Sequence, residues 1–108
     1  MSAFHVTEAE SVILEALWRY GPLPPARLIA EVKASRPWGE ATIKTLLARL
    51  KHKRVVRSAR EEGVLRYHPM IERSAYVEHE VARLVDHLFG GDAAALTGFL
   101  ERRTPASR

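Results

Sequence analysis

Apolar residues recur at helical spacing in the segment from Trp38 to Arg54. Ile43, Leu46, Leu47 and Leu50 occupy positions i, i+3, i+4 and i+7, which places four large apolar side chains on one face of a helix. The opposite face carries small, hydroxylated or basic residues, namely Thr42, Thr45, Ala48, Arg49 and His52. Small residues let a helix lie close to another surface, and an arginine can reach a phosphate or a guanine edge. The segment therefore predicts an amphipathic helix that could read a DNA groove.

An earlier helix is predicted over about residues 8–20. Thr7 and Glu10 have the spacing of a capping box, which favours a helix start, and Gly21-Pro22 favours its end. Its buried stripe is expected to be an apolar series at helical spacing, Ile13, Ala16, Leu17 and Tyr20. Trp18 lies beside that stripe and is expected to pack in the core or against a neighbouring part of the chain.

A second helix is predicted to begin at Leu23-Pro24-Pro25, because proline costs little in a first helical turn. Its buried edge is expected to consist of Leu28, Ile29 and Val32. Residues 33–39 then form the turn into the helix of residues 38–54. Two helices, a turn and a basic amphipathic helix predict a helix-turn-helix, in which the last helix enters the major groove.

Two β-favouring runs follow this pattern. Residues 55–60 and 64–69 flank Glu61-Glu62-Gly63, a turn that contains glycine. They predict the hairpin of a winged helix. Its basic residues are expected to contact the DNA backbone beside the groove-bound helix, and they are Arg57, Arg60 and Arg66.

The pattern changes after Pro69. Residues 72–89 predict a long helix with a near-heptad apolar seam of Val77, Val81, Leu84, Val85 and Leu88. Gly90-Gly91 ends it, Asp92 can cap another helix, and that helix has an apolar side formed by Leu96, Phe99 and Leu100. Two such helices cannot bury these faces on themselves, so we expect a symmetric homodimer.

The expected fold is mainly α with a small β-hairpin. Residues 1–70 would form a winged-helix DNA-binding domain and residues 71–104 a helical dimerisation region, followed by a flexible tail at 105–108.

The distribution of charge supports this division. Residues 1–70 carry 12 Lys and Arg against seven Asp and Glu, a net +5, whereas residues 71–108 carry five against six, a net −1. Between Lys44 and Arg66, eight basic residues oppose only two acidic ones, which gives +6. Such a cluster is typical of a surface that binds a polyanion, most commonly duplex DNA. A membrane surface is less well supported, because no lipid-seeking face of Trp, Phe and Leu accompanies the charge.

The residues expected to bind DNA lie on the polar face of the helix at 38–54, at its end and on the hairpin. They are Thr42, Lys44, Thr45, Arg49, Lys51, Lys53, Arg54, Arg57, Arg60 and Arg66. The alternative is a winged-helix module that docks another protein through the same helices. That alternative does not require the concentrated positive charge, and its binding would not fall steeply with salt.

Other classes of function find little support in the sequence. The chain lacks the nucleophile-elbow, phosphate-loop and zinc-protease motifs, so we expect neither an enzyme nor a cofactor. It has no cysteine, which excludes disulfides and thiolate metal sites. His79 and His87 are two helical turns apart and are better explained as surface or interface residues than as metal ligands. No apolar run reaches the length of a membrane span, and we expect a cytoplasmic protein.

The sequence resembles the penicillinase-repressor family, the BlaI, MecI and CopY regulators, over about residues 5–101. The matching positions are Thr7 with Glu10, Leu17-Trp18, Gly21-Pro22-Leu23, the block from Trp38 to Leu50, Lys53, Tyr67 with Pro69, and Leu88-Phe89-Gly90-Gly91. The resemblance implies an N-terminal winged helix on a palindromic operator, a helical dimerisation region, and repression that an external signal relieves.

Three departures from that family's pattern bear on function. Arg54 stands where a glycine usually follows the lysine, so the helix exit is expected to be built differently. The copper-responsive branch has C-terminal cysteines that this chain lacks, so copper sensing is not expected. The β-lactam-responsive members are cut by a sensor protease, an implied partner, within an Asn-Phe pair, and residues 95–100 contain no such pair.

Overall fold

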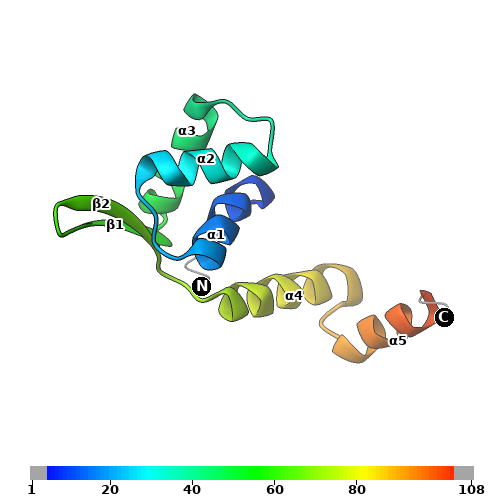
Figure 1. Ribbon diagram of the computed structural model, residues 1–108. Helices are drawn as coiled ribbons and strands as arrows, with labels where there is room; N and C mark the ends of the chain where they lie inside the picture. The colour runs from blue at the N-terminus through cyan, green and yellow to red at the C-terminus, as the bar shows by residue number, and fades with distance from the viewer. Residues whose placement is uncertain (1–4, 104–108) are drawn as a thin grey trace. The chain divides into compact units, whose positions relative to one another are not determined.

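The computed structural model describes residues 5–103, which form helices and one two-stranded antiparallel hairpin (Figure 1). The elements are α1 (Glu8–Tyr20), α2 (Pro25–Ser35), α3 (Glu40–His52), β1 (Val56–Glu61), β2 (Val64–Pro69), α4 (Arg73–Phe89) and α5 (Ala93–Arg103). The predicted class, mainly α with a small hairpin, is confirmed. The tail expected at 105–108 lies outside the described residues.

The chain divides into two compact units, one ending at Arg73 and the other beginning at Ser74. The first unit contains α1, α2, α3 and the hairpin, and the second contains α4 and α5. The assignment of these parts to DNA binding and to dimerisation stays a prediction.

Helix α1 begins with the predicted capping box. The Thr7 hydroxyl accepts a hydrogen bond from the Glu10 amide at 3.1 Å, and a Glu10 carboxylate oxygen accepts one from the Thr7 amide at 3.0 Å. The buried stripe consists of Glu10, Ile13, Leu14 and Leu17. The expectation that Tyr20 belongs to it was wrong: Tyr20 is 44% exposed, because the helix ends there and its ring lies beneath two arginines.

Helices α2 and α3 complete the core of the first unit. Leu28 and Val32 of α2 are buried, whereas Ile29 is half-buried. Helix α2 continues through Ser35, so the turn into α3 is shorter than residues 33–39. The four apolar residues predicted for the buried face of α3 are all buried, and they are Ile43, Leu46, Leu47 and Leu50.

The hairpin is joined to the helices at its base. Leu23 and Tyr67 exchange backbone hydrogen bonds of 3.3 and 2.8 Å, so the segment before α2 extends the pairing of β2. The Trp18 indole donates to the Ile71 carbonyl at 2.9 Å and secures the chain after β2. At the other end, Glu62 and Gly63 form a two-residue turn in which both φ angles are positive, 52° and 82°. This is the turn that matches the twist of paired strands.

In the second unit, two glycines with positive φ end α4. Gly90 has a φ of 58° and Gly91 a φ of 85°. Asp92 then caps α5 as predicted, because its carboxylate accepts from the amides of Ala94 at 3.0 Å and Ala95 at 3.3 Å.

Candidate nucleic-acid interface

Helix α3 exposes the face that the sequence assigned to DNA. Thr42, Thr45, Ala48 and Arg49 are all exposed, while the buried face holds the helix against the core. Lys44 is also exposed and pairs with Glu40 at 2.9 Å one turn earlier. The hydrogen bond and charge of Lys44 hold the pKa of Glu40 below its ordinary value. A pair between exposed side chains is weak, so a phosphate could compete for Lys44.

The exit of α3 has the geometry that glycine normally provides. Arg54 has a φ of 66°, in the left-handed region. Its amide donates to the Lys51 carbonyl at 3.0 Å, and the Val55 amide donates to the Leu50 carbonyl at 3.1 Å. These two bonds form a Schellman motif, in which Leu50 and Val55 are both buried. The expectation of a differently built exit was therefore wrong, because the backbone keeps this conformation with an arginine in it.

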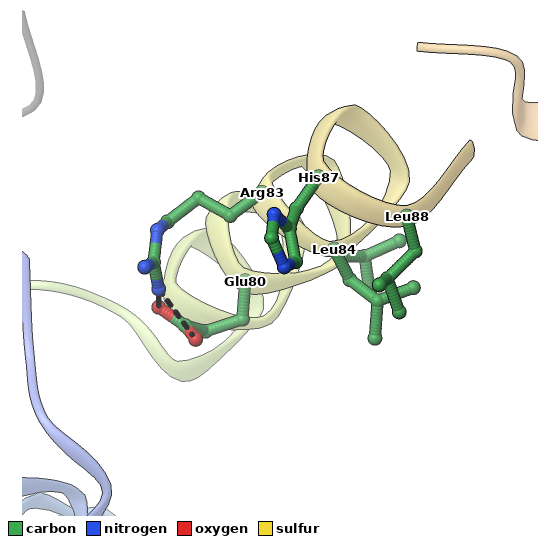
Figure 2. Close-up of a pocket in the computed structure, with 6 residues that line it drawn as sticks. Glu80, Arg83, Leu84, His87 and Leu88 are labelled. Carbon is green, nitrogen blue, oxygen red and sulfur yellow. Dashed lines mark hydrogen bonds and ion pairs between the residues drawn. The ribbon is translucent and has the colours of Figure 1, made fainter. Parts of the chain in front are cut away.

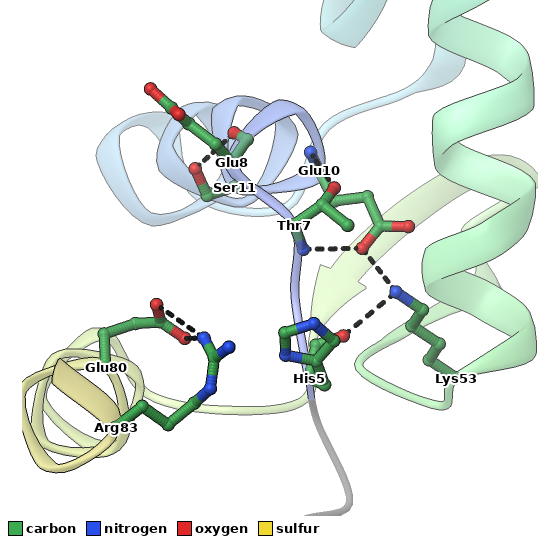
Figure 3. Close-up of polar contacts among 8 residues, drawn as sticks. All are labelled: His5, Thr7, Glu8, Glu10, Ser11, Lys53, Glu80 and Arg83. Atoms are coloured by element: carbon green, nitrogen blue, oxygen red, sulfur yellow. Dashed lines mark hydrogen bonds and ion pairs between the residues drawn. The ribbon is translucent and has the colours of Figure 1, made fainter. Parts of the chain in front are cut away.

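Lys53 is placed differently from the other basic residues assigned to DNA. Its ammonium lies 2.6 Å from a Glu10 carboxylate oxygen and 2.9 Å from the His5 carbonyl oxygen (Figure 3). Glu10 is only 1% exposed. Burial opposes its ionisation, but hydrogen bonds from Lys53 and Thr7 and the charge of Lys53 together hold the pKa of Glu10 below its ordinary value. The structure therefore gives Lys53 an intramolecular partner that the sequence reasoning missed.

The hairpin places its three arginines on two faces. Side chains alternate along a strand, so Arg57 and Arg60 point to opposite sides. The register pairs Ala59 with Arg66 and Arg60 with Leu65, which puts Arg57 and Arg66 on one face and Arg60 on the other. The sequence predicts the same role for all three arginines, and the geometry separates them.

Glu61 opposes the charge on the face that carries Arg66. Its carboxylate oxygens lie 3.7 Å from the Arg66 Nε and 2.9 Å from the buried Nε2 of His68. Arg60 instead donates to the Gly63 carbonyl at 3.0 Å and remains exposed.

Tyr67 joins the hairpin to the end of α3. The Lys51 ammonium lies 5.7 Å from the centroid of the Tyr67 ring, within the range of a cation–π interaction. Tyr67 shares its hairpin face with Ser58 and Arg60. Through Tyr67, that face of the hairpin therefore meets the last turn of α3, and alternation along β2 is the sequence signal that could have revealed which residues share it.

The residues assigned to dimerisation divide into exposed and covered groups. The exposed group is Val77, Val81, Leu84, Leu88, Phe99 and Leu100. Leu96 is half-buried, and the Phe99 ring lies 6.1 Å from the Phe89 ring. Val85 is only 7% exposed and is covered within the chain itself, so little of its side chain is available to a partner. Its assignment to the dimer seam stays a prediction.

Within residues 5–103, no group of three or more His, Asp or Glu side chains is arranged to hold a metal ion. None of the helices described is long and apolar enough to cross a membrane.

The chain is similar to known proteins over most of its length. The profile of a family described as penicillinase repressor matches residues 6–108. The penicillinase repressor of Bacillus licheniformis is 26% identical over 97 residues, which cover 89% of this chain and 76% of that protein. The methicillin resistance regulatory protein MecI of Mammaliicoccus sciuri is 21% identical over 100 residues, which cover 92% of this chain and 81% of that protein.

Two solved structures share the fold. The monomeric form of Bacillus licheniformis BlaI, in complex with the blaP half-operator, matches with a TM-score of 0.62 and 26% identity, over 68% of this chain and 89% of that one. The DNA-binding domain of the repressor BlaI matches with a TM-score of 0.60 and 26% identity over the same shares, 68% and 89%. The winged-helix architecture predicted from the sequence is thus confirmed.

Proposed function

The chain belongs to the penicillinase repressor family, and we propose that it represses transcription in the cytoplasm as a homodimer bound to a palindromic operator. Members of this family are DNA-binding transcriptional repressors and not enzymes. The observation that carries the proposal is the exposed face of α3, with Thr42, Thr45 and Arg49, beside a basic hairpin. A helix presented in this way fits the major groove.

Contacts to bases and to phosphates are assigned to different residues. Thr42, Thr45 and Arg49 face the groove and would read base edges, because an arginine fork can bind guanine through two hydrogen bonds. The basic residues around them would contact phosphates and supply affinity without sequence information, and they are Lys44, Lys51, Arg54, Arg57, Arg60 and Arg66. The BlaI structure on a half-operator supports the use of one winged helix for each half-site.

The direct test is to incubate the purified protein with genomic DNA fragments, wash at moderate salt and sequence the fragments retained. We expect a shared palindrome whose half-site centres lie about 10 base pairs, or a multiple of that, apart. The Arg49→Ala protein is the comparison and should retain fewer fragments, with the preference at one base pair of each half-site relaxed. Retention without a shared sequence, or binding that is insensitive to salt, would instead favour the protein-docking alternative.

Homodimerisation is proposed through the exposed seam of α4. Val77, Val81, Leu84 and Leu88 follow near-heptad spacing, and Leu88 is 61% exposed. Beside this seam, Arg83 pairs with Glu80 at 3.3 Å and His87 lies on the next turn (Figure 2). An apolar strip with charged edges can pair with its own copy around a two-fold axis.

Substitution of the seam tests the dimer. Leu84→Lys should convert the protein to monomers in analytical ultracentrifugation, because a charge would have to be buried in the interface. It should also weaken binding to a two-half-site operator much more than to a single half-site, since tethering is lost. Ala82→Lys is the matched control, because Ala82 is exposed on α4 outside the seam. A dimer that survives Leu84→Lys would refute the seam as the interface.

Release from DNA is proposed to occur through loss of the dimer. Cutting or displacing α5 near Leu96–Leu100 would remove part of the interface and leave the winged helix folded, so monomers would dissociate by mass action. Cleavage by a sensor protease is one route, although residues 95–100 lack the Asn-Phe pair. Exposing cells to a β-lactam and following the protein by gel would separate the routes, because induction with an intact chain excludes cleavage.

A further inference from the structure

Lys53 carries the most completely engaged basic side chain of the candidate interface. Its ammonium donates to the Glu10 carboxylate at 2.6 Å and to the His5 carbonyl at 2.9 Å, and its side chain is 30% exposed. His5 precedes α1, and Glu10 lies in the first turn of that helix. A residue at the end of α3 is thus joined to residues more than 40 positions earlier in the chain.

Glu10 holds this lysine in place by its own burial. The same carboxylate oxygen that accepts from Lys53 also accepts from the Thr7 amide at 3.0 Å, so it serves the capping box and the ion pair together. If Lys53 turned toward a phosphate, a carboxylate that is 1% exposed would lose its counter-charge. Leaving a buried charge unpaired is strongly unfavourable, and an exposed phosphate contact does not compensate for it.

The position of Lys53 links two parts of the DNA-binding surface. Its amide donates to the Arg49 carbonyl at 2.9 Å, which closes the last turn of α3. Arg54 follows in the left-handed conformation, and β1 begins at Val56. Holding the Lys53 side chain therefore restrains the turn that carries Arg49 and the direction in which the hairpin leaves α3.

We propose that Lys53 is a positioning residue, which through Glu10 and His5 fixes the end of α3 and the start of the hairpin in the geometry that binds DNA. It does not contact phosphate, unlike its exposed neighbour Lys51. This inference rests on the proposed function, because it concerns how the same DNA surface is held.

The test uses three variants of the pair, which are Glu10→Gln, Lys53→Gln and the double variant that carries both substitutions. Lys51→Gln is the variant with which they are compared. Melting temperatures are measured by circular dichroism. Affinity for a duplex carrying the recovered operator is measured over a series of salt concentrations, at a temperature where every variant is folded. Glu10→Gln is the decisive variant, because it leaves the charge of Lys53 in place and removes the opposing charge of its partner, while the glutamine carbonyl can still accept from the Thr7 amide.

We expect both single variants of the pair to lower the melting temperature by roughly 5 to 15 °C, and the double variant to be no worse than the poorer single one. Each should weaken operator binding by about threefold to thirtyfold. The salt slope, which is the dependence of log affinity on log salt concentration, should stay the same as in the unaltered protein. Lys51→Gln should keep the melting temperature and flatten the slope by about one phosphate per half-site. Amide signals of Arg49 and Arg54 should shift in the Glu10→Gln spectrum.

Three results would overturn the proposal. A flatter salt slope for Lys53→Gln, with Glu10→Gln binding as tightly as the unaltered protein or more tightly, would make Lys53 a phosphate contact. Additive losses of melting temperature would show that the two residues do not act together. Unchanged operator affinity in both single variants would reduce the link to a purely stabilising one. Failure of the proposed function is recognisable separately, because then the unaltered protein would retain no duplex at any salt concentration.

Discussion

Arg57 and Arg60 lie on the same strand and point to opposite faces of the hairpin. Arg60 shares its face with Tyr67, whose ring lies 5.7 Å from the Lys51 ammonium of α3, whereas Arg57 and Arg66 lie on the other face. Arg57 lies on the face where Glu61 opposes the positive charge. Equal charge along a strand therefore does not mean equal access to DNA.

The first prediction follows from this difference. Arg60→Gln should flatten the dependence of log affinity on log salt by about one phosphate per half-site, with little change in sequence preference. Arg57→Gln is the matched control, with the same charge change on the same strand, and should flatten it less. The measurement is fluorescence anisotropy with specific and scrambled duplexes at several salt concentrations. A larger effect of Arg57→Gln would reverse the assignment of the two faces.

The second prediction concerns base recognition by Arg49. Arg49→Ala should cost on the order of 1 to 3 kcal/mol in operator affinity and relax the preference at one base pair of each half-site. Arg49→Lys retains the charge but lacks the guanidinium that can donate two hydrogen bonds to one base. Compared with Arg49→Ala, it should therefore recover non-specific affinity for DNA but not the preference at that base pair. Competition with single-base operator variants measures both effects. Operator affinity that is unchanged in Arg49→Ala would remove Arg49 from the reading face.

The reading helix could be predicted because its pattern is local. The spacing of Ile43, Leu46, Leu47 and Leu50 determines which side of α3 is buried, so the exposed side follows without knowledge of the rest of the fold. The hairpin could be predicted for the same reason, from two β-favouring runs around Gly63. Local periodicity is sufficient wherever one element has one buried face.

What the sequence did not reveal depends on contacts between distant segments. Glu10 was recognised as a capping residue, but its pairing with Lys53 requires the start of α1 to meet the end of α3. Val85 has the spacing of the dimer seam and is nevertheless only 7% exposed in the single chain. Spacing identifies an apolar residue and does not say which neighbour covers it, so these assignments needed the three-dimensional structure.

The third prediction concerns the strained exit of α3. Arg54 has a φ of 66°, a conformation that costs an L-residue other than glycine roughly 1 kcal/mol or more. The free energy of unfolding of Arg54→Gly should therefore exceed that of Arg54→Ala by about 1 kcal/mol, although both variants lack the charge. Urea denaturation measures the difference. Equal stability of the two variants would argue against strain at this position. If Arg54 contacts phosphate, both substitutions should weaken DNA binding to the same extent.

The fourth prediction concerns acid stability. The pKa of Glu10 lies below its ordinary value of 4.5 in the folded protein, so the ionised carboxylate stabilises the fold. That contribution is complete above about pH 4.5 and is lost as the pH falls through the lower, folded-state pKa. Glu10→Gln should be less stable at neutral pH and should lose less stability between neutral pH and pH 3. Thermal melts across this pH range measure the difference. The prediction is contradicted if the melting temperatures of Glu10→Gln and the unaltered protein fall in parallel.

The exposed seam of α4 also has a consequence for the cell's control of this protein. Because Leu84 and Leu88 are exposed to water, association of two chains would bury apolar surface and is favoured. At chain concentrations well below the dissociation constant, the number of pairs rises with the square of the number of chains. Halving the amount of protein would then leave about a quarter of the pairs. If only the pair holds an operator, modest changes in synthesis or turnover of the chain would become large changes in promoter occupancy, so that the gene would respond to a threshold of abundance.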